Sequence, residues 1–422
     1  MRKIIALIVL GSVLFTACQD RVFVTRDANK PIYQDVSEWR ATSFALEGPR
    51  KLSQAGKIYL YNNYLFVVEK GSGIHFIDNQ DPHNPSVFGF LPVYACSDIS
   101  VKNDQLYVDS YFDILVFDIS DVNNPSLSSR AENAISFDDY TSLPGLHEGY
   151  PIAAINETDK VIIGWEIAEV TDEQFFSSQS FFRGNVLFAE SASLDGGSTT
   201  GGGTIGIGGS MAQFTIVDNF LYTAKANQLN SFDIAADGSL SKNSSTVVDR
   251  TVETIFPYNN HLFLGTTTGM VIYDRTMPQT PQYVGHIDHV QSCDPVVVDG
   301  NRAYVTLSTS EVCWGTNQLD VIDVSNYSSP SILSSFWFTN PKGLGLDGAN
   351  LFLCDGSDGL KVFDRSDDLD IVGNMISHFP GISTYDVIPY NGYLIMIGDD
   401  GIYQYDYSDI NNIFEISLIP VS

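Results

Sequence analysis

Short runs of alternating apolar and polar residues follow one another along most of the chain, and they recur in groups of four. Such alternation predicts β-strands, because successive side chains of a strand point to opposite faces. No window shows a convincing helical period. The second run of each group carries a pair of mostly large residues after a polar turn, at Leu65-Phe66, Leu106-Tyr107, Leu221-Tyr222, Leu262-Phe263, Ala303-Tyr304, Leu351-Phe352 and Leu394-Ile395.

The third run of each group ends on an Asp, and the fourth follows a Pro. The stretch VFDISDVNNP at 116–125 shows this most clearly, and it returns in altered form as HFIDNQDPHNP at 75–85, VIYDRTMPQTP at 271–281 and VIDVSNYSSP at 321–330. An Asp at this place accepts hydrogen bonds from backbone amides of the turn, and the Pro sets the bend into the next strand.

The repeat unit is therefore four short strands joined by tight turns. Neighbouring units lie 41 residues apart between Leu65 and Leu106 and 48 residues apart between Ala303 and Leu351. Four strands in roughly 40–45 residues are typical of a β-propeller blade, and blades bury their faces by packing radially around an axis. We expect an all-β propeller of antiparallel blades. Counting a weak unit near Val161 gives eight blades; seven blades with an elaborated connection is the alternative.

The first twenty residues, MRKIIALIVLGSVLFTACQD, predict an export signal. Two cations precede an apolar run from Ile4 to Phe15 that is too short for a finished membrane span. Leu14-Phe15-Thr16-Ala17-Cys18 resembles a lipoprotein cleavage site, in which the Cys carries the lipid. This predicts a signal peptide at 1–17, a lipidated tether and lead-in segment at 18–50, and one propeller domain at 51–422 with a Gly-rich insertion around 191–210. By resemblance to lipoprotein sorting signals, Gln19 favours the outer membrane, on its periplasmic or cell-surface face.

The formal charge of −29 and a pI near 4.3 exclude classes of partner. So acidic a chain repels nucleic-acid backbones and anionic lipid headgroups. We therefore expect no nucleic acid, and membrane attachment only through the N-terminal lipid. A glycan, a peptide or an envelope protein remains as partner, bound by a monomeric propeller.

The repeats also resemble a known family. GIHFIDNQDPHNPSVFGF, DILVFDISDVNNPSL and NQLDVIDVSNYSSPSIL look like the LVIVD repeat of bacterial and archaeal cell-surface proteins. The resemblance extends from about Leu52 to the C-terminus and is weakest over 131–212. It implies an exported propeller, and it implies little about the ligand because the repeat, and not a reaction, defines the family.

Cysteines outside the cytoplasm can pair. Cys293 opens an innermost strand, and Cys313 lies in the loop that leaves the second strand of the same unit, so the hairpin returns both to one face. We expect a disulfide between them; closing a loop of about 20 residues would contribute on the order of 3 kcal/mol. A Cys96–Cys354 bridge is not expected.

Candidate ligand-binding residues lie at the start of the inner strands and in one loop. Asp98, Asp294 and Asp386 share a register that places them around the channel mouth, where carboxylates could bind calcium or a cationic ligand, or simply satisfy local amides. Trp314, beside Cys313, offers a ring for stacking on a sugar or peptide, or fills the core. Calcium is the only cofactor this pattern suggests, and we assign no metal site.

Three further motifs are weaker. The run HIDHVQSCD at 286–294 contains metal-ligand residue types, but its residues cross the radius of a blade and need not converge. The Gly-rich stretch 196–209 lacks the Lys and the strand-to-helix context of a phosphate loop. No nucleophile, base and orienting group stand at a recognisable spacing, so we assign no catalytic residue.

These observations favour a membrane-anchored, non-catalytic binding or scaffold protein whose loops present a site. The alternative is an exported propeller hydrolase or lyase that acts on polysaccharide, for which two convergent carboxylates in the channel would be required.

Overall fold

The computed structural model describes residues 22–53, 56–137, 139–157, 159–174, 206–290, 292, 295–309 and 315–421. Nearly all of their regular structure is β-strand. The helical segments in these ranges are one short α-helix, α2 (Val36–Arg40), and two 3-10 turns at Tyr140–Ser142 and Val372–Asn374. Within the same ranges, no helix has the length and hydropathy needed to cross a bilayer.

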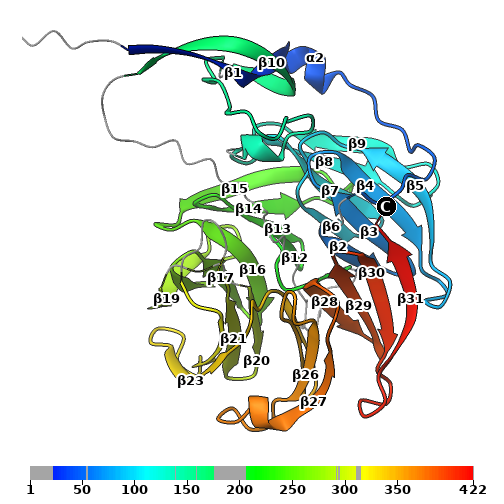
Figure 1. Ribbon diagram of the computed structural model, residues 1–422, viewed down its shortest axis with the longest axis vertical. Coiled ribbons are helices and arrows are strands. Elements are labelled where there is room, and N and C mark those ends of the chain that lie inside the picture. Colours follow the sequence, from blue (N-terminus) through cyan, green and yellow to red (C-terminus); the bar gives the residue numbers. More distant parts are fainter. Residues whose placement is uncertain are drawn as a thin grey trace, which may run out of the picture. The chain divides into compact units, whose positions relative to one another are not determined.

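Seven antiparallel sheets form the propeller, with each blade built from strands consecutive in sequence (Figure 1). Blade 1 comprises β2 (Ile58–Tyr61), β3 (Tyr64–Glu69), β4 (Gly73–Asp78) and β5 (Ser86–Pro92). Blade 2 comprises β6 (Ile99–Lys102), β7 (Gln105–Ser110), β8 (Asp113–Asp118) and β9 (Ser126–Ala131). Blade 3 comprises β12 (Phe214–Val217), β13 (Phe220–Lys225), β14 (Gln228–Ile234) and β15 (Leu240–Val247).

The remaining blades follow in order along the chain. Blade 4 comprises β16 (Val252–Tyr258), β17 (His261–Thr266), β18 (Gly269–Asp274) and β19 (Gln282–Asp288). Blade 5 comprises β20 (Val296–Asp299), β21 (Arg302–Leu307), β22 (Gln318–Asp323) and β23 (Ser331–Trp337). Blade 6 comprises β24 (Leu344–Asp347), β25 (Asn350–Cys354), β26 (Leu360–Asp364) and β27 (Met375–Phe379), and blade 7 comprises β28 (Thr384–Tyr390), β29 (Tyr393–Gly398), β30 (Gly401–Asp406) and β31 (Phe414–Pro420).

The expected turn chemistry is present. The Asp that ends the third strand accepts a hydrogen bond from the amide two residues later: Asp118 from Ser120 at 2.9 Å, and Asp274 from Thr276 at 2.6 Å. The same bond is made by Asp78, Asp323, Asp364 and Asp406. The same hydrogen bond from an Asp to a turn amide therefore follows the third strand in six of the seven blades.

The prediction of eight blades was wrong, and the alternative of seven is correct. The segment near Val161 that we counted as a weak unit is β10 (Lys160–Gln174), which pairs antiparallel with β1 (Val22–Asp35) and joins no blade. Its alternation is that of a strand, but its partner lies more than 120 residues earlier in the chain, outside the repeat.

The strands β1 and β10 belong to a second compact unit, separate from the propeller, that contains residues 22–40 and 145–174 of the described chain. Asn29 fastens β1 to the connection after Gly145. Its side-chain amide donates to the carbonyl oxygens of His147 and Tyr150, both at 2.9 Å, and its Oδ1 accepts from the His147 amide at 2.9 Å. Residues 22–35 lie within the segment that the sequence predicts to be a tether and lead-in. In the structure they form a long strand.

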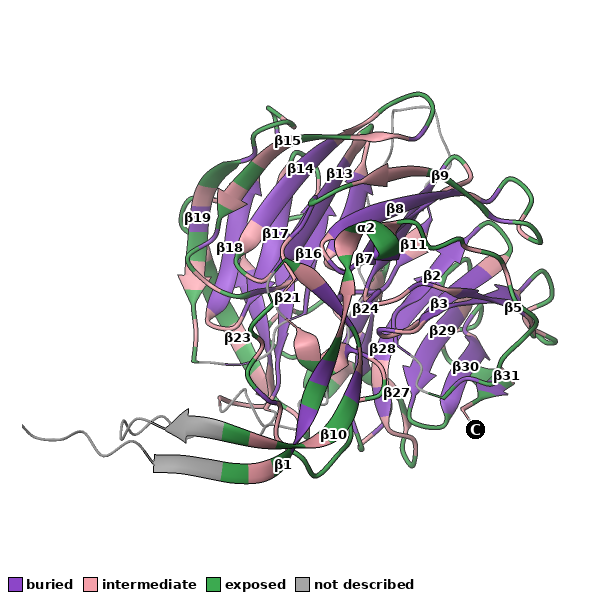
Figure 2. Ribbon diagram, turned by 90° about the horizontal axis from the view of Figure 1, so that it is seen from above, coloured by how far each residue is buried: buried purple, intermediate pink, exposed green. Residues whose placement is uncertain are grey.

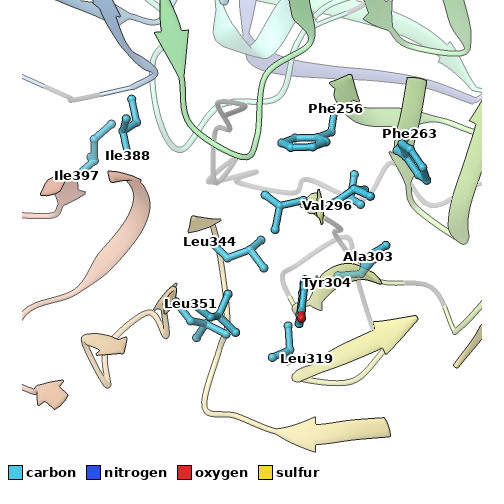
Figure 3. Close-up of a cluster of buried hydrophobic side chains, with 14 of the residues drawn as sticks. Phe256, Phe263, Val296, Ala303, Tyr304, Leu319, Leu344, Leu351, Ile388 and Ile397 are labelled. Carbon is cyan, nitrogen blue, oxygen red and sulfur yellow. The ribbon is translucent and has the colours of Figure 1, made fainter. Parts of the chain in front are cut away.

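The core of the propeller lies between the blades. Figure 3 shows Phe256, Val296, Leu344 and Ile388, from the inner strands of blades 4 to 7, directed into one apolar cluster. All four are buried. Figure 2 shows the outer strands β19 and β23 as largely exposed or half-buried, so ligand contacts are available mainly at the rim and in the loops.

Candidate functional site

The centre of the ring is occupied by the end of the Gly-rich insertion. Residues 206–213, the axial segment, include β11 (Ile207–Gly208), which pairs with β2 of blade 1. The Gly206 amide donates to Val101 in blade 2 at 3.0 Å, and Ala212 accepts from Ile255 in blade 4 at 2.7 Å. Most of the segment is buried, including Met211 and Ala212.

Two of the predicted channel carboxylates hold this segment. Asp98 is buried, and its Oδ2 accepts from the amides of Gln213 at 2.5 Å and Phe214 at 2.8 Å and from Lys57 Nζ at 2.8 Å. Burial raises the pKa of Asp98, against the opposing effect of the Lys57 ammonium. Asp386 is also buried and accepts from Ser210 Oγ at 3.2 Å. Both carboxylates therefore bind the chain's own residues.

Several predicted site residues lie outside the described ranges: Cys18, Cys293, Cys313, Asp294 and Trp314. The expected disulfide and the stacking role of Trp314 consequently stay predictions. Cys96 lies buried against the Gly73 carbonyl oxygen of blade 1, at 3.6 Å from its Sγ, whereas Cys354 is buried in β25 of blade 6. Among the residues with described positions, no three His, Cys, Asp or Glu side chains gather as metal ligands.

A groove of about 470 Å³ lies between blades 3 and 4, on the outer part of the propeller. One wall comes from the end of β15 and the loop after it, and the other from β18 and β19. Its lining is mixed, with aromatic, aliphatic and polar side chains: Thr246, Val247, Asp249, Arg250, Val271, Tyr273, Pro281, Gln282, Tyr283 and His286. Its volume lies within the range of about 300–1,000 Å³ that is typical of ligand sites, and it is the candidate binding site.

A β-bulge sets the aromatic wall of the groove. Tyr283 pairs with Tyr273 and His286 with Val271, because the register shifts between Ile272 and Tyr273. Tyr283 and His286, three residues apart, therefore face the same side of the sheet. The Tyr283 hydroxyl lies 2.5 Å from His286 Nδ1, and the Tyr273 and Tyr283 rings meet edge to face with centroids 6.1 Å apart.

Arg250 braces the polar end of the groove. Its Nη1 lies 2.6 Å from Asp288 Oδ1 at the end of β19 and donates to the Thr268 carbonyl oxygen at 3.2 Å. Its Nε lies 3.6 Å from Asp249 Oδ1. The hydrogen bond from Arg250 lowers the pKa of Asp288, while burial raises the pKa of Tyr273. With one guanidinium and two carboxylates, this end of the groove carries no excess positive charge.

Sequence reasoning missed this groove. His286 was considered as a metal ligand, but its ring bonds Tyr283, and His289 Nδ1 bonds the Val290 carbonyl oxygen at 2.5 Å. The sequence offers one signal, a Tyr and a His in the outermost strand where solvent-facing polar residues are expected. The bulge that aligns them leaves no mark in the pattern of apolar residues.

Comparisons with known proteins agree with this architecture. Residues 94–132 and 292–337 match the family model of the LVIVD repeat. The first segment spans blade 2, and the second spans blade 5. The chain is thus a seven-bladed β-propeller that carries LVIVD repeats. None of the curated proteins compared with the chain matches it.

Solved structures resemble it at low identity. Sqt1 from Saccharomyces cerevisiae is 11% identical with a TM-score of 0.51, over 92% of this chain and 88% of that one. A protein from Lactobacillus plantarum is 12% identical with a TM-score of 0.51, over 87% and 98%. BamB from Moraxella catarrhalis is 8% identical with a TM-score of 0.47, over 91% and 97%. At such identities the first two likenesses show the fold alone.

Proposed function

We propose that this protein is an outer-membrane lipoprotein, attached through Cys18, whose propeller binds a neutral glycan without catalysis. The groove between blades 3 and 4 is the evidence for a bound ligand. The predicted export signal with its lipoprotein-like cleavage site is the basis for the location. The single observation that carries the proposal is the half-exposed ring of Tyr283 in a groove whose lining also includes planar polar side chains.

The chemistry of the lining suits a sugar. A sugar ring has apolar faces and hydroxyl edges, and an aromatic side chain supplies contact area to such a face at low entropic cost. Gln282, Asp249 and Arg250 bring amide, carboxylate and guanidinium groups to the same groove. These groups donate and accept hydrogen bonds in fixed planes, as a ring of hydroxyls requires.

Charge favours a neutral ligand. Arg250 is held by Asp288 and lies beside Asp249, so no uncompensated cation remains there to attract a carboxylate or sulfate group. The whole chain carries a formal charge of −29, which lowers the local concentration of anionic ligands further. An acidic polysaccharide is therefore disfavoured.

The test is binding of neutral oligosaccharides derived from β-glucan, xylan, mannan and starch, measured by calorimetry on the soluble propeller-containing chain without its lipid. At least one class should bind, and Tyr283→Ala should weaken it about tenfold or more, equivalent to about 1.4 kcal/mol. Tyr390→Ala, which removes another partly exposed tyrosine from blade 7, is the matched control and should bind normally. Failure of every sugar, or equal affinity of Tyr283→Ala and the parent, would refute the proposal.

A further inference from the structure

We infer that the groove is one end of a longer binding track that crosses to blade 5 and ends at Trp337, so that the ligand is a linear polysaccharide and not a short sugar. This inference rests on the proposed function and adds the length of the ligand to it. Two observations away from the groove carry it: an exposed tryptophan, and hydrogen bonds of its strand that direct it toward blade 4.

Trp337 is the last residue of β23, and its side chain is 73% exposed. Its neighbours Phe336 and Phe338 are half-buried and pack against the main core cluster. Exposed single apolar residues are common, but a tryptophan so fully exposed at a strand end provides a large flat surface with no role in the core. It is a second stacking platform of the kind that Tyr283 supplies in the groove.

The hydrogen bonds of neighbouring β23 residues fix the direction in which this platform faces. Ser335 lies two residues before Trp337 with a continuous register, so both side chains lie on the same face of β23. The Ser335 hydroxyl donates to Asp320 Oδ1 at 2.5 Å. On the opposite face of the strand, the Ser334 hydroxyl donates to the Asp368 carbonyl oxygen of blade 6 at 2.5 Å. Trp337 therefore lies on the side of blade 5 that faces blade 4.

Residues of equal register connect the two ends of the track. Val247, Asp288 and Trp337 each pair with the first residue of the third strand in blades 3, 4 and 5 respectively. They therefore occupy equivalent heights on three consecutive blades. A ligand that leaves the groove past Asp288 at this height reaches Trp337 on the next blade.

The spacing of apolar and polar groups favours a linear glycan over a bilayer. Asp288, with 65% of its side chain exposed, lies between the apolar positions, and Gln318 pairs with Trp337 at the far end. A membrane surface would require contiguous apolar side chains flanked by cations, and the acidic chain repels anionic lipid. A sugar polymer presents apolar faces and polar edges in turn, which matches this sequence of groups.

The experiment compares a disaccharide and an octasaccharide of the neutral glycan class that binds the parent chain. Trp337→Ala should weaken the octasaccharide about tenfold and leave the disaccharide unchanged, whereas Tyr283→Ala should weaken both. Phe414→Ala, which removes an exposed ring from β31 of blade 7, is the matched control and should alter neither affinity. Thermal denaturation of each variant confirms that the fold is retained.

The following outcomes would contradict the inference, and they distinguish its failure from a failure of the proposed function. If Tyr283→Ala weakens binding but Trp337→Ala leaves the octasaccharide unaffected, the track is wrong and the groove alone is the site. If Trp337→Ala weakens the disaccharide and the octasaccharide equally, Trp337 acts on the groove and not as a separate platform, and the inference is again wrong. If no glycan binds the parent chain, the proposed function fails and the track fails with it.

Discussion

At the scale of single residues, the charged side chains near the propeller axis stabilise the fold. Asp109, fully buried at the end of β7, accepts hydrogen bonds from Lys225 Nζ in blade 3, the Ser97 hydroxyl and the Ser97 amide, each at 2.6 Å. Burial alone would raise the pKa of Asp109, but Lys225 and Ser97 outweigh burial, and the pKa lies below its ordinary value. The ion pair joins two blades whose connection contains the long segment 132–213.

The depressed pKa of Asp109 predicts acid sensitivity. Its contribution to stability is fully present above the unfolded pKa of about 3.9 and is lost as the pH falls through the lower folded value. Asp109→Asn should lower the free energy of unfolding at pH 6 by about 3–5 kcal/mol, because Lys225 is left buried without its partner. Urea denaturation at several pH values measures this. The double variant Asp109→Asn, Lys225→Met should lose less than the sum of the single losses, and strict additivity would show that the pair is not coupled.

At the scale of elements, the axial segment has an unusual requirement for glycine. A Cβ on Gly206 would lie 2.2 Å from the Tyr59 ring and 2.8 Å from the Leu60 carbonyl oxygen, and a Cβ on Gly209 would lie 2.3 Å from Asp386 Oδ2. At Gly206 and Gly209, the described end of the Gly-rich stretch, glycine thus allows close packing at the centre of the ring, a role different from the phosphate loop or flexible insertion that such a composition also suggests. Composition alone does not distinguish these roles.

The close contacts of Gly206 predict a specific loss of stability. Gly206→Ala should lower the free energy of unfolding by about 1–3 kcal/mol, since Tyr59 and the β2 backbone must shift to admit the methyl group. Gly48→Ala is the matched control, because nothing lies within 4 Å of its added Cβ. Chemical denaturation of the two variants and the parent provides the measurement. Equal stability of both variants would mean that the axial segment is not packed as described.

The elements divide into those that local sequence determines and those that it does not. The strands and turns of each blade follow from alternation and from the Asp and Pro of the turn, because these signals act over a few residues. The pairing of β1 with β10 does not, because the two strands lie more than 120 residues apart and neither belongs to a repeat unit. The groove also escapes prediction: its two walls come from different blades, and a bulge brings Tyr283 and His286 to one face.

At the scale of the whole molecule, the ring closes without a strand shared between the first and last blades. Blade 1 begins at Ile58 and blade 7 ends at Pro420, and each blade is continuous in sequence apart from the added β11. The two blades meet through the apolar cluster, a bridge between Leu52 and Val421, hydrogen bonds from Gln404 and Ser417 to the Pro82 carbonyl oxygen, and one pair of amide side chains. Neither composition nor period reveals this mode of closure, because it depends on side chains 325 residues apart.

Substitution of Asn79 and Gln404 tests directly whether this amide pair helps to close the ring. Asn79 Nδ2 donates to Gln404 Oε1 at 3.0 Å and Gln404 Nε2 donates to Asn79 Oδ1 at 2.7 Å, with both side chains buried. Asn79→Ala should lower the free energy of unfolding by about 1–3 kcal/mol, because it leaves the buried Gln404 Oε1 without its donor, while Gln404 Nε2 keeps its bonds to Pro82 and Ser417. Gln404→Ala should cost a similar amount, and the double variant should cost less than the sum, as urea denaturation of the four chains would show. If the two losses add, the two amides are not coupled, and the pair does not contribute as a unit to closing the ring.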